Sequence, residues 1–122
     1  MKCLIVDDSR VVRKVTERIV QNLGFECFEA GNGQEAYDFC IENTPDVVLL
    51  DWNMPVMSGI EFLEKIKAHD NGKNIKVIFC TTENSPDYIE RAMNAGADEY
   101  IMKPFDREII KFKLALVGLI SA

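Results

Sequence analysis

The stretch VVLLDWNMP, residues 47–55, decides the fold, because it joins a fully apolar run to an aspartate. Four consecutive apolar residues, Val47 to Leu50, are typical of a strand that is buried on both faces in the middle of a parallel sheet. The residues from Asp51 to Pro55 then predict a loop. Asp51 is therefore expected just beyond the carboxyl end of a central strand.

Similar apolar runs alternate with amphipathic stretches along the rest of the chain. Further strands are expected at residues 3–6, 25–29, 75–80 and 99–102. Ser9 is a suitable N-cap for a helix that carries apolar residues at positions 11, 12, 15, 19, 20 and 23 and that closes at Gly24. Other helices are expected at residues 33–43, around residues 60–66, from Ser85-Pro86 to Gly96, and from a cap at Asp106 towards Ile120.

The alternation of these elements predicts an α/β domain. Each parallel crossover is right-handed and lays a helix on the sheet, so about 120 residues of strand–helix units form a doubly wound parallel sheet with helices on both faces.

Composition narrows the class of protein. The 122 residues include 20 acidic and 14 basic side chains, a net charge of −6, which argues against a nucleic-acid-binding surface. The apolar runs are far shorter than the roughly 20 residues that a membrane span needs. Met1-Lys2 leads straight into a short strand-like run, so no signal peptide is expected. Four widely spaced cysteines are interpreted as buried apolar residues in a reducing compartment, the cytoplasm, rather than as disulfides or metal ligands.

Polar residues at the predicted strand ends point to chemistry at one edge of the sheet, where doubly wound domains place their sites. These residues are Asp7, Asp8, Asp51, Thr81 and Lys103. Three clustered carboxylates repel one another and favour a hard cation such as Mg²⁺. A carboxylate can also attack phosphorus to give an aspartyl phosphate, whose charge a metal ion and a lysine would neutralise.

Four stretches of the chain, residues 3–9, 47–59, 77–83 and 95–105, resemble the receiver domains of two-component response regulators. DWNMP at 51–55 and MKPF at 102–105 are especially similar to the single-domain chemotaxis regulators. The resemblance covers essentially the whole chain. It implies one receiver domain over residues 1–122, with a flavodoxin-like fold whose five-stranded sheet has the order 2-1-3-4-5 and is flanked by five helices.

The same resemblance implies a phosphoacceptor and a metal site. Asp51 would take a phosphoryl group from a histidine kinase or a phosphotransfer protein. Mg²⁺ would be bound by Asp51, directly by Asp8, mainly through water by Asp7, and by the backbone carbonyl of Asn53.

It further implies the residues that respond to phosphorylation. Lys103 would pair with the phosphoryl oxygens, aimed by a cis peptide before Pro104. Thr81 would hydrogen-bond the phosphoryl group and draw its loop inward, and Tyr100 would then move from an exposed to a buried position. The rate of self-hydrolysis would be set by the residues that flank the acceptor, Asn53 and Glu83. Trp52 has two interpretations, an exposed partner contact or a lid over the pocket.

The last predicted helix carries two apolar stripes. One is expected to be buried and consists of Ile110, Leu114 and Val117. The other consists of Ile109, Phe112, Leu116, Leu119 and Ile120. This second stripe is either the ordinary exposed apolar surface of a small domain or the contact face for a protein partner or a second copy of the chain.

The leading hypothesis is a phosphorylation switch that signals by protein contact, acts only on itself, and reads out through the fourth helix, the fifth strand and the last helix. A Mg²⁺-dependent phosphohydrolase with an aspartate nucleophile is one alternative, although such enzymes usually carry a second aspartate where this chain has Asn53. A flavodoxin-like cofactor module is another, although Asp7 and Asp8 would repel a phosphate. The chain could also be a receiver cut from a longer regulator. The pathway, whether flagellar motor control, phosphorelay or kinase control, and the downstream target stay open.

Overall fold

Strands and helices alternate along the chain in the computed structural model, which describes residues 1–52, 54, 56–82 and 85–121. The strands in these ranges are β1 (Lys2–Val6), β2 (Glu26–Ala30), β3 (Val47–Asp51), β4 (Lys76–Thr81) and β5 (Glu99–Met102). The helices are α1 (Arg10–Asn22), α2 (Gly33–Asn43), α3 (Gly59–Ala68), α4 (Pro86–Asn94) and α5 (Arg107–Leu116).

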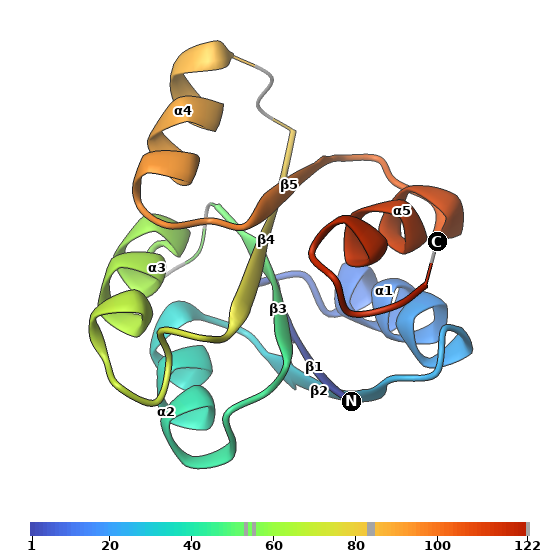
Figure 1. Ribbon diagram of the computed structural model, residues 1–122, viewed down its shortest axis with the longest axis horizontal. Helices are drawn as coiled ribbons and strands as arrows, with labels where there is room; N and C mark the ends of the chain where they lie inside the picture. Colours follow the sequence, from blue (N-terminus) through green and yellow to red (C-terminus); the bar gives the residue numbers. More distant parts are fainter. Residues whose placement is uncertain (53, 55, 83–84, 122) are drawn as a thin grey trace.

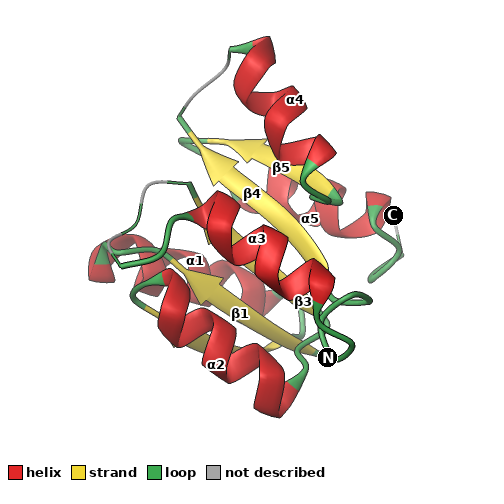
Figure 2. Cartoon of the chain, turned by 90° about the vertical axis from the view of Figure 1, so that its left-hand side faces the viewer, coloured by secondary structure: helices red, strands yellow, loops and turns green. Residues whose placement is uncertain are grey.

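The strands form one parallel sheet in the order β2-β1-β3-β4-β5. Helices α1 and α5 cover one face of the sheet and α2, α3 and α4 cover the other (Figure 1). Figure 2, turned by 90°, shows α2 and α3 on the side of the viewer and β4 and β5 side by side above α3. The predicted doubly wound α/β architecture and its strand order are confirmed.

Each face of the sheet has its own apolar core, which explains the fully apolar run in β3. Val48 and Leu50 pack on the side of α2, α3 and α4, while Val47 and Leu49 pack on the side of α1 and α5. Because alternate residues of a strand face opposite sides, a strand between two helical layers must be apolar at every position.

The four cysteines are free thiols that belong to this packing. Three of them, Cys3, Cys40 and Cys80, are buried as expected, whereas Cys27 is only partly buried. Burial raises the pKa of the Cys40 and Cys80 thiols to about 12, so these two stay protonated and unreactive at neutral pH.

The last helix is shorter than predicted. It ends at Leu116 instead of running towards Ile120, because Gly118 adopts a left-handed conformation with φ of 84°. Two hydrogen bonds close the end: Gly118 N–H donates to Ala115 at 3.0 Å and Leu119 N–H donates to Leu114 at 3.0 Å. This pattern is a Schellman motif, for which glycine is the preferred residue. The prediction overlooked Gly118 as the stop.

Smaller differences concern the strand boundaries. Strands β2 and β4 each lie one residue later than predicted, so Thr81 is the last residue of β4. Asp51 likewise ends β3 and does not begin the loop. Within the described ranges, no helix is both long enough and apolar enough to cross a membrane.

Candidate functional site

The pairing of β1 with β3 brings the acidic residues together. Val6 pairs with Leu50, so the chain that leaves β1 runs beside the end of β3. Asp7 and Asp8 follow Val6 directly, and Asp51 follows Leu50. The strand order reverses between these two strands, which is where doubly wound sheets place their binding sites.

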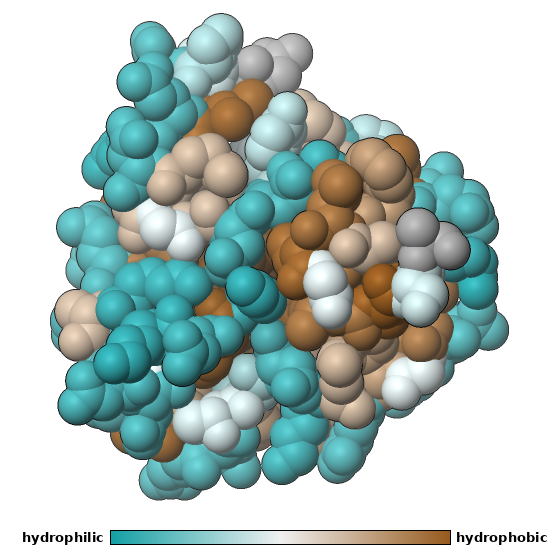
Figure 3. Space-filling view, viewed as in Figure 1, coloured by the Kyte–Doolittle hydropathy of each residue, from teal (hydrophilic) through white to brown (hydrophobic). Residues whose placement is uncertain are grey.

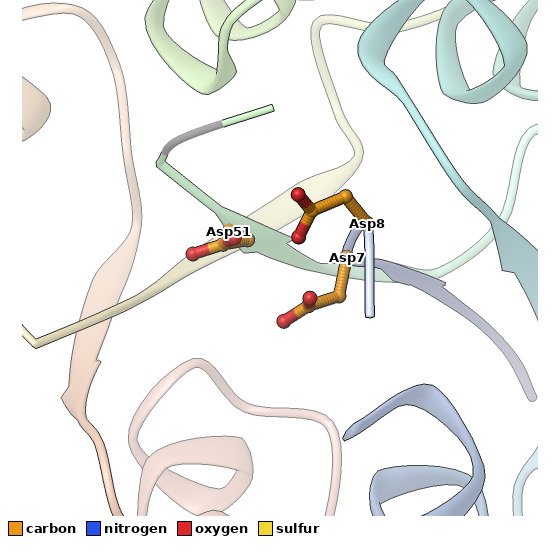
Figure 4. A group of neighbouring side chains, drawn as sticks. All are labelled: Asp7, Asp8 and Asp51. Carbon is orange, nitrogen blue, oxygen red and sulfur yellow. The ribbon is translucent and has the colours of Figure 1, made fainter. Parts of the chain in front are cut away.

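The three carboxylates form one cluster. Oxygens of Asp7, Asp8 and Asp51 all lie within 4.8 Å of one another. Figure 4 shows the carboxylates of Asp7 and Asp8, from the end of β1, and of Asp51, from β3, turned to the same side. Asp7 is buried, Asp51 is half-buried and Asp8 is exposed. Three hard oxygen donors at this spacing, one open to solvent, suit a small divalent cation such as Mg²⁺.

Lys103, from the end of β5, places a cation against this cluster. Its Nζ lies 2.8 Å from Asp7 Oδ2 and 3.3 Å from Asp51 Oδ1. Burial lowers the pKa of Lys103, but the hydrogen bond that Lys103 donates to Asp7 and the charges of both aspartates outweigh burial and raise it overall. Lys103 is therefore a fixed positive charge at neutral pH. The peptide bond between Lys103 and Pro104 is cis, as the resemblance implies.

Asp51 is held by the main chain as well as by Lys103. Its Oδ1 accepts a hydrogen bond from the backbone N–H of Trp52 at 2.9 Å. Gly59, at the start of α3, lies so close that a Cβ there would be 2.5 Å from the Asp51 carbonyl oxygen. Burial raises the pKa of Asp51 and Lys103 opposes this effect, while the nearby charge of Asp7 adds to it; the net shift is upward.

Thr81 is the last residue of β4, and Tyr100 lies on the neighbouring strand β5. Thr81 is buried, and its carbonyl accepts the backbone N–H of Lys103 at 2.8 Å. Tyr100 is half-buried against the core, with the Nζ of Lys113 4.7 Å from its ring centroid. Lys113 also forms an ion pair of 3.1 Å with Glu99.

Trp52, for which the sequence left an exposed partner contact and a lid over the pocket as interpretations, is half-buried. Its indole packs on Phe79 and on Tyr88, with centroid distances of 5.1 Å in both cases. It is partly buried against the core and connects the end of β3 to α4. Asn53 and Glu83, also named from the sequence, lie outside the described residues.

An apolar groove of about 420 Å³ lies beside Lys103, between α1 and the segment after β5. Val11, Val15 and Phe105 line it together with Lys103. Val11 and Val15 are 73% and 53% exposed, so this part of the apolar pattern of α1 faces solvent instead of the core. Periodicity alone could not separate these valines from the buried positions.

Only part of the second apolar stripe predicted for the last helix is exposed on α5. Ile109, Phe112 and Leu116 are exposed, and Figure 3 shows apolar side chains gathered over α5 and the segment that follows. Leu119 and Ile120 lie beyond the helix and pack against the core that α5 covers, which removes them from the stripe. Ile110, Leu114 and Val117 face inward as expected.

Comparisons with known proteins agree with this geometry. A family model described as response regulator receiver domain matches residues 3–115. Chemotaxis protein CheY1 of Helicobacter pylori (strain J99) is 39% identical over 119 residues, which are 96% of each chain. A structure of Vibrio cholerae chemotaxis protein CheY4 superposes with a TM-score of 0.90 at 34% identity, covering 95% of this chain and 97% of that one.

A further similar structure bears on the metal. It is the receiver domain of sensor histidine kinase PA1611 from Pseudomonas aeruginosa, described with a magnesium ion coordinated in its active-site cleft. Its TM-score is 0.86 at 27% identity, with 96% of this chain and 97% of that chain covered.

Proposed function

Because this chain belongs to the response regulator receiver domain family and thus to two-component signalling, we propose that it is a switch phosphorylated on Asp51. The donor is a histidine kinase or a phosphotransfer protein. One observation carries the proposal: three carboxylates converge within 4.8 Å, with the Lys103 ammonium against two of them. Chemotaxis is the pathway we favour, given the name of the Helicobacter pylori relative.

Mg²⁺ is the cofactor we propose for the acidic cluster. Asp8 is the exposed carboxylate and would bind the ion directly, while Asp7, which already pairs with Lys103, would act mainly through water. By the resemblance to receiver domains, Asp51 and the backbone carbonyl of Asn53 would be the other protein ligands. The ion would neutralise the phosphoryl oxygens as negative charge develops on them. A receiver of similar structure was described with magnesium in its cleft.

The chemical step requires one free oxygen on Asp51. Among the described residues, Asp51 accepts its hydrogen bonds on Oδ1, from Lys103 and from Trp52. This leaves Oδ2 as the nucleophile. Its attack on phosphorus forms a P–O bond and breaks the P–N bond of the phosphohistidine. The electron pair passes to the imidazole nitrogen, and Lys103 stabilises the charge on the transferred oxygens.

The groove beside Lys103 offers a surface for the phosphodonor. Lys103 lines both the groove and the acidic site. A donor segment that lays apolar side chains on Val11, Val15 and Phe105 therefore brings its phosphohistidine within reach of Asp51. We propose this groove as the donor-docking surface.

The signal would leave through a surface different from the donor-docking groove. Phosphorylation adds close to two negative charges and new acceptor oxygens, for which Thr81 is a hydrogen-bond donor. The N–H of Lys103 is bound to the Thr81 carbonyl, so movement at Thr81 would reach β5 and Tyr100. The output surface would be α4, β5 and the exposed part of α5, read by a downstream protein; a second copy of the chain is the alternative occupant.

The family match gives no support to the phosphohydrolase alternative, and we propose that the chain catalyses only its own phosphorylation and dephosphorylation. A cytoplasmic location fits the four free thiols.

The test is incubation with Mg²⁺ and acetyl phosphate, followed by intact-mass analysis. We expect one added phosphoryl group that is stable in acid and lost in base. The Asp51→Asn variant should gain none, and chelation of Mg²⁺ should prevent the gain in the wild type. Equal phosphorylation of Asp51→Asn would overturn the assignment.

A further inference from the structure

Arg13 reaches from α1 to the turn that carries two of the three carboxylates. Its Nη1 donates a hydrogen bond of 2.6 Å to the backbone carbonyl of Asp7. Its Nε binds Glu29 Oε1, on β2, at 3.1 Å. Only 17% of the Arg13 side chain is exposed. Arg13 thus uses two different nitrogens to connect the ends of β1 and β2.

The carbonyl that Arg13 binds belongs to the peptide group that joins Asp7 to Asp8. The other side of Asp7 is also fixed, because its N–H donates to the Ala30 carbonyl at 3.2 Å. A hydrogen bond from a charged guanidinium is short and directional and restricts rotation of the peptide plane. Rotation of this plane would turn the two carboxylates relative to each other.

We propose that Arg13 is a positioning residue for the metal site, which holds the Asp7–Asp8 peptide in the orientation that directs both carboxylates towards one cation. The inference rests on the proposed Mg²⁺ site at Asp7, Asp8 and Asp51. Glu29 acts behind Arg13 by orienting the guanidinium. Groups that orient metal ligands without touching the metal often change affinity by about 10- to 100-fold when they are removed.

Lys14 provides a matched control. It forms an ion pair with the same Glu29, at 2.7 Å, and its described contacts do not include Asp7. Replacing Lys14 or Arg13 by methionine removes one positive charge from the same ion-pair network. Only the replacement of Arg13 removes the contact with the Asp7 carbonyl, so the comparison separates charge from position.

Arg13→Lys makes the complementary change. It keeps the positive charge, but a single ammonium nitrogen cannot reproduce the two-nitrogen bridge between Glu29 and the Asp7 carbonyl. Glu29→Gln keeps Arg13 and weakens its orientation.

The experiment is calorimetric titration of the full chain with MgCl₂, without phosphodonor, for the wild type and these four variants. We expect Mg²⁺ affinity to fall about tenfold in Arg13→Met and Arg13→Lys, to fall less in Glu29→Gln, and to stay within about twofold in Lys14→Met. Circular dichroism verifies folding; if Arg13→Met does not fold, Arg13→Lys and Glu29→Gln decide. Wild-type affinity in Arg13→Lys, or an equal loss in Lys14→Met, overturns the positioning role. If the wild type itself binds no Mg²⁺, the proposed function fails and the positioning role fails with it.

Discussion

Lys103 forms its shorter ion pair with Asp7, at 2.8 Å, although the two residues lie 96 positions apart in the chain. Asp7 is buried and would carry an uncompensated charge without this partner. Lys103 therefore has a role before any phosphoryl group arrives: it offsets the repulsion among carboxylates that the parallel strands force together.

Replacing Lys103 by methionine should separate metal binding from phosphoryl transfer. Loss of a cation beside the carboxylates should tighten Mg²⁺ binding several-fold, since less positive charge opposes the ion. Phosphorylation by acetyl phosphate should slow by about a hundredfold, because a preorganised charge on the transferred oxygens is lost. Calorimetry and time-resolved intact mass measure the two effects. Lys67→Met, which breaks the ion pair with Asp98 away from the site, should change neither.

The raised pKa of Asp51 predicts a stability cost that depends on pH. Its pKa is higher in the folded than in the unfolded chain, so ionisation of Asp51 destabilises the fold at pH values above the folded pKa. Asp51→Asn should therefore be more stable than the wild type at neutral pH. The advantage should shrink as the pH falls through the folded pKa and vanish below the unfolded one. Urea unfolding at neutral and acidic pH measures it; a less stable Asp51→Asn at neutral pH contradicts the prediction.

A charge placed in the apolar groove should slow phosphorylation by a protein donor but not by a small-molecule donor. Val15→Glu should slow phosphoryl transfer from a phosphorylated histidine kinase by tenfold or more. A tenfold change corresponds to about 1.4 kcal/mol, which is on the order of the free energy lost when one apolar side chain is no longer buried. Phosphorylation by acetyl phosphate should keep its wild-type rate, since the acidic cluster is untouched. Met93→Glu, a similar change at an exposed apolar residue of α4, is the control.

Fluorine NMR of protein labelled with 3-fluorotyrosine can follow Tyr100 directly. Phosphorylation should shift the Tyr100 resonance, and Thr81→Val should remove most of that shift because its side chain cannot donate to the phosphoryl group. Lys113→Met should move the resonance before phosphorylation, since Lys113 lies 4.7 Å from the ring centroid. An unchanged phosphorylation shift in Thr81→Val would exclude the proposed link.

The exposed part of α5 can be tested against the segment that follows it. Phe112→Glu and Leu116→Glu should leave the free energy of unfolding within about 0.5 kcal/mol of the wild type, as for other surface changes. They should weaken any self-association seen by sedimentation, and binding of the downstream protein. Leu119→Glu should instead destabilise the fold by about 1–3 kcal/mol, because Leu119 packs against the core. Self-association and binding that survive both helix substitutions would remove this face from the proposal.

The parts of the fold that could be predicted are those set by neighbouring residues. The apolar run before Asp51 specified a central strand, and Ser9 and Asp106 cap α1 and α5 through side-chain hydrogen bonds as expected. The end of α5 was missed because apolar periodicity outweighed a single glycine, Gly118, in the prediction. The exposure of Val15 was missed because helical spacing does not say what lies opposite each residue.

The residues of the site also fall into a group that the sequence predicts and a group that it does not. Its carboxylates and Lys103 could be predicted because parallel strands end at a common edge. Arg13 and Trp52 could not, because their contacts depend on how α1 and α4 sit on the sheet. Nothing local to Arg13 indicates that its side chain returns to the carbonyl of Asp7.

The site forms only after β1 has paired with β3 in the native register. Asp7 and Asp51 meet only when Val6 pairs with Leu50, and a slip of one residue would turn alternate side chains to the wrong face. Lys103 joins them only after β5 has been added at the far side of β4. In a nascent or partly unfolded chain, these three side chains would therefore not be assembled into a site. The donor would then phosphorylate only fully folded molecules, so the signal would depend on the concentration of folded protein.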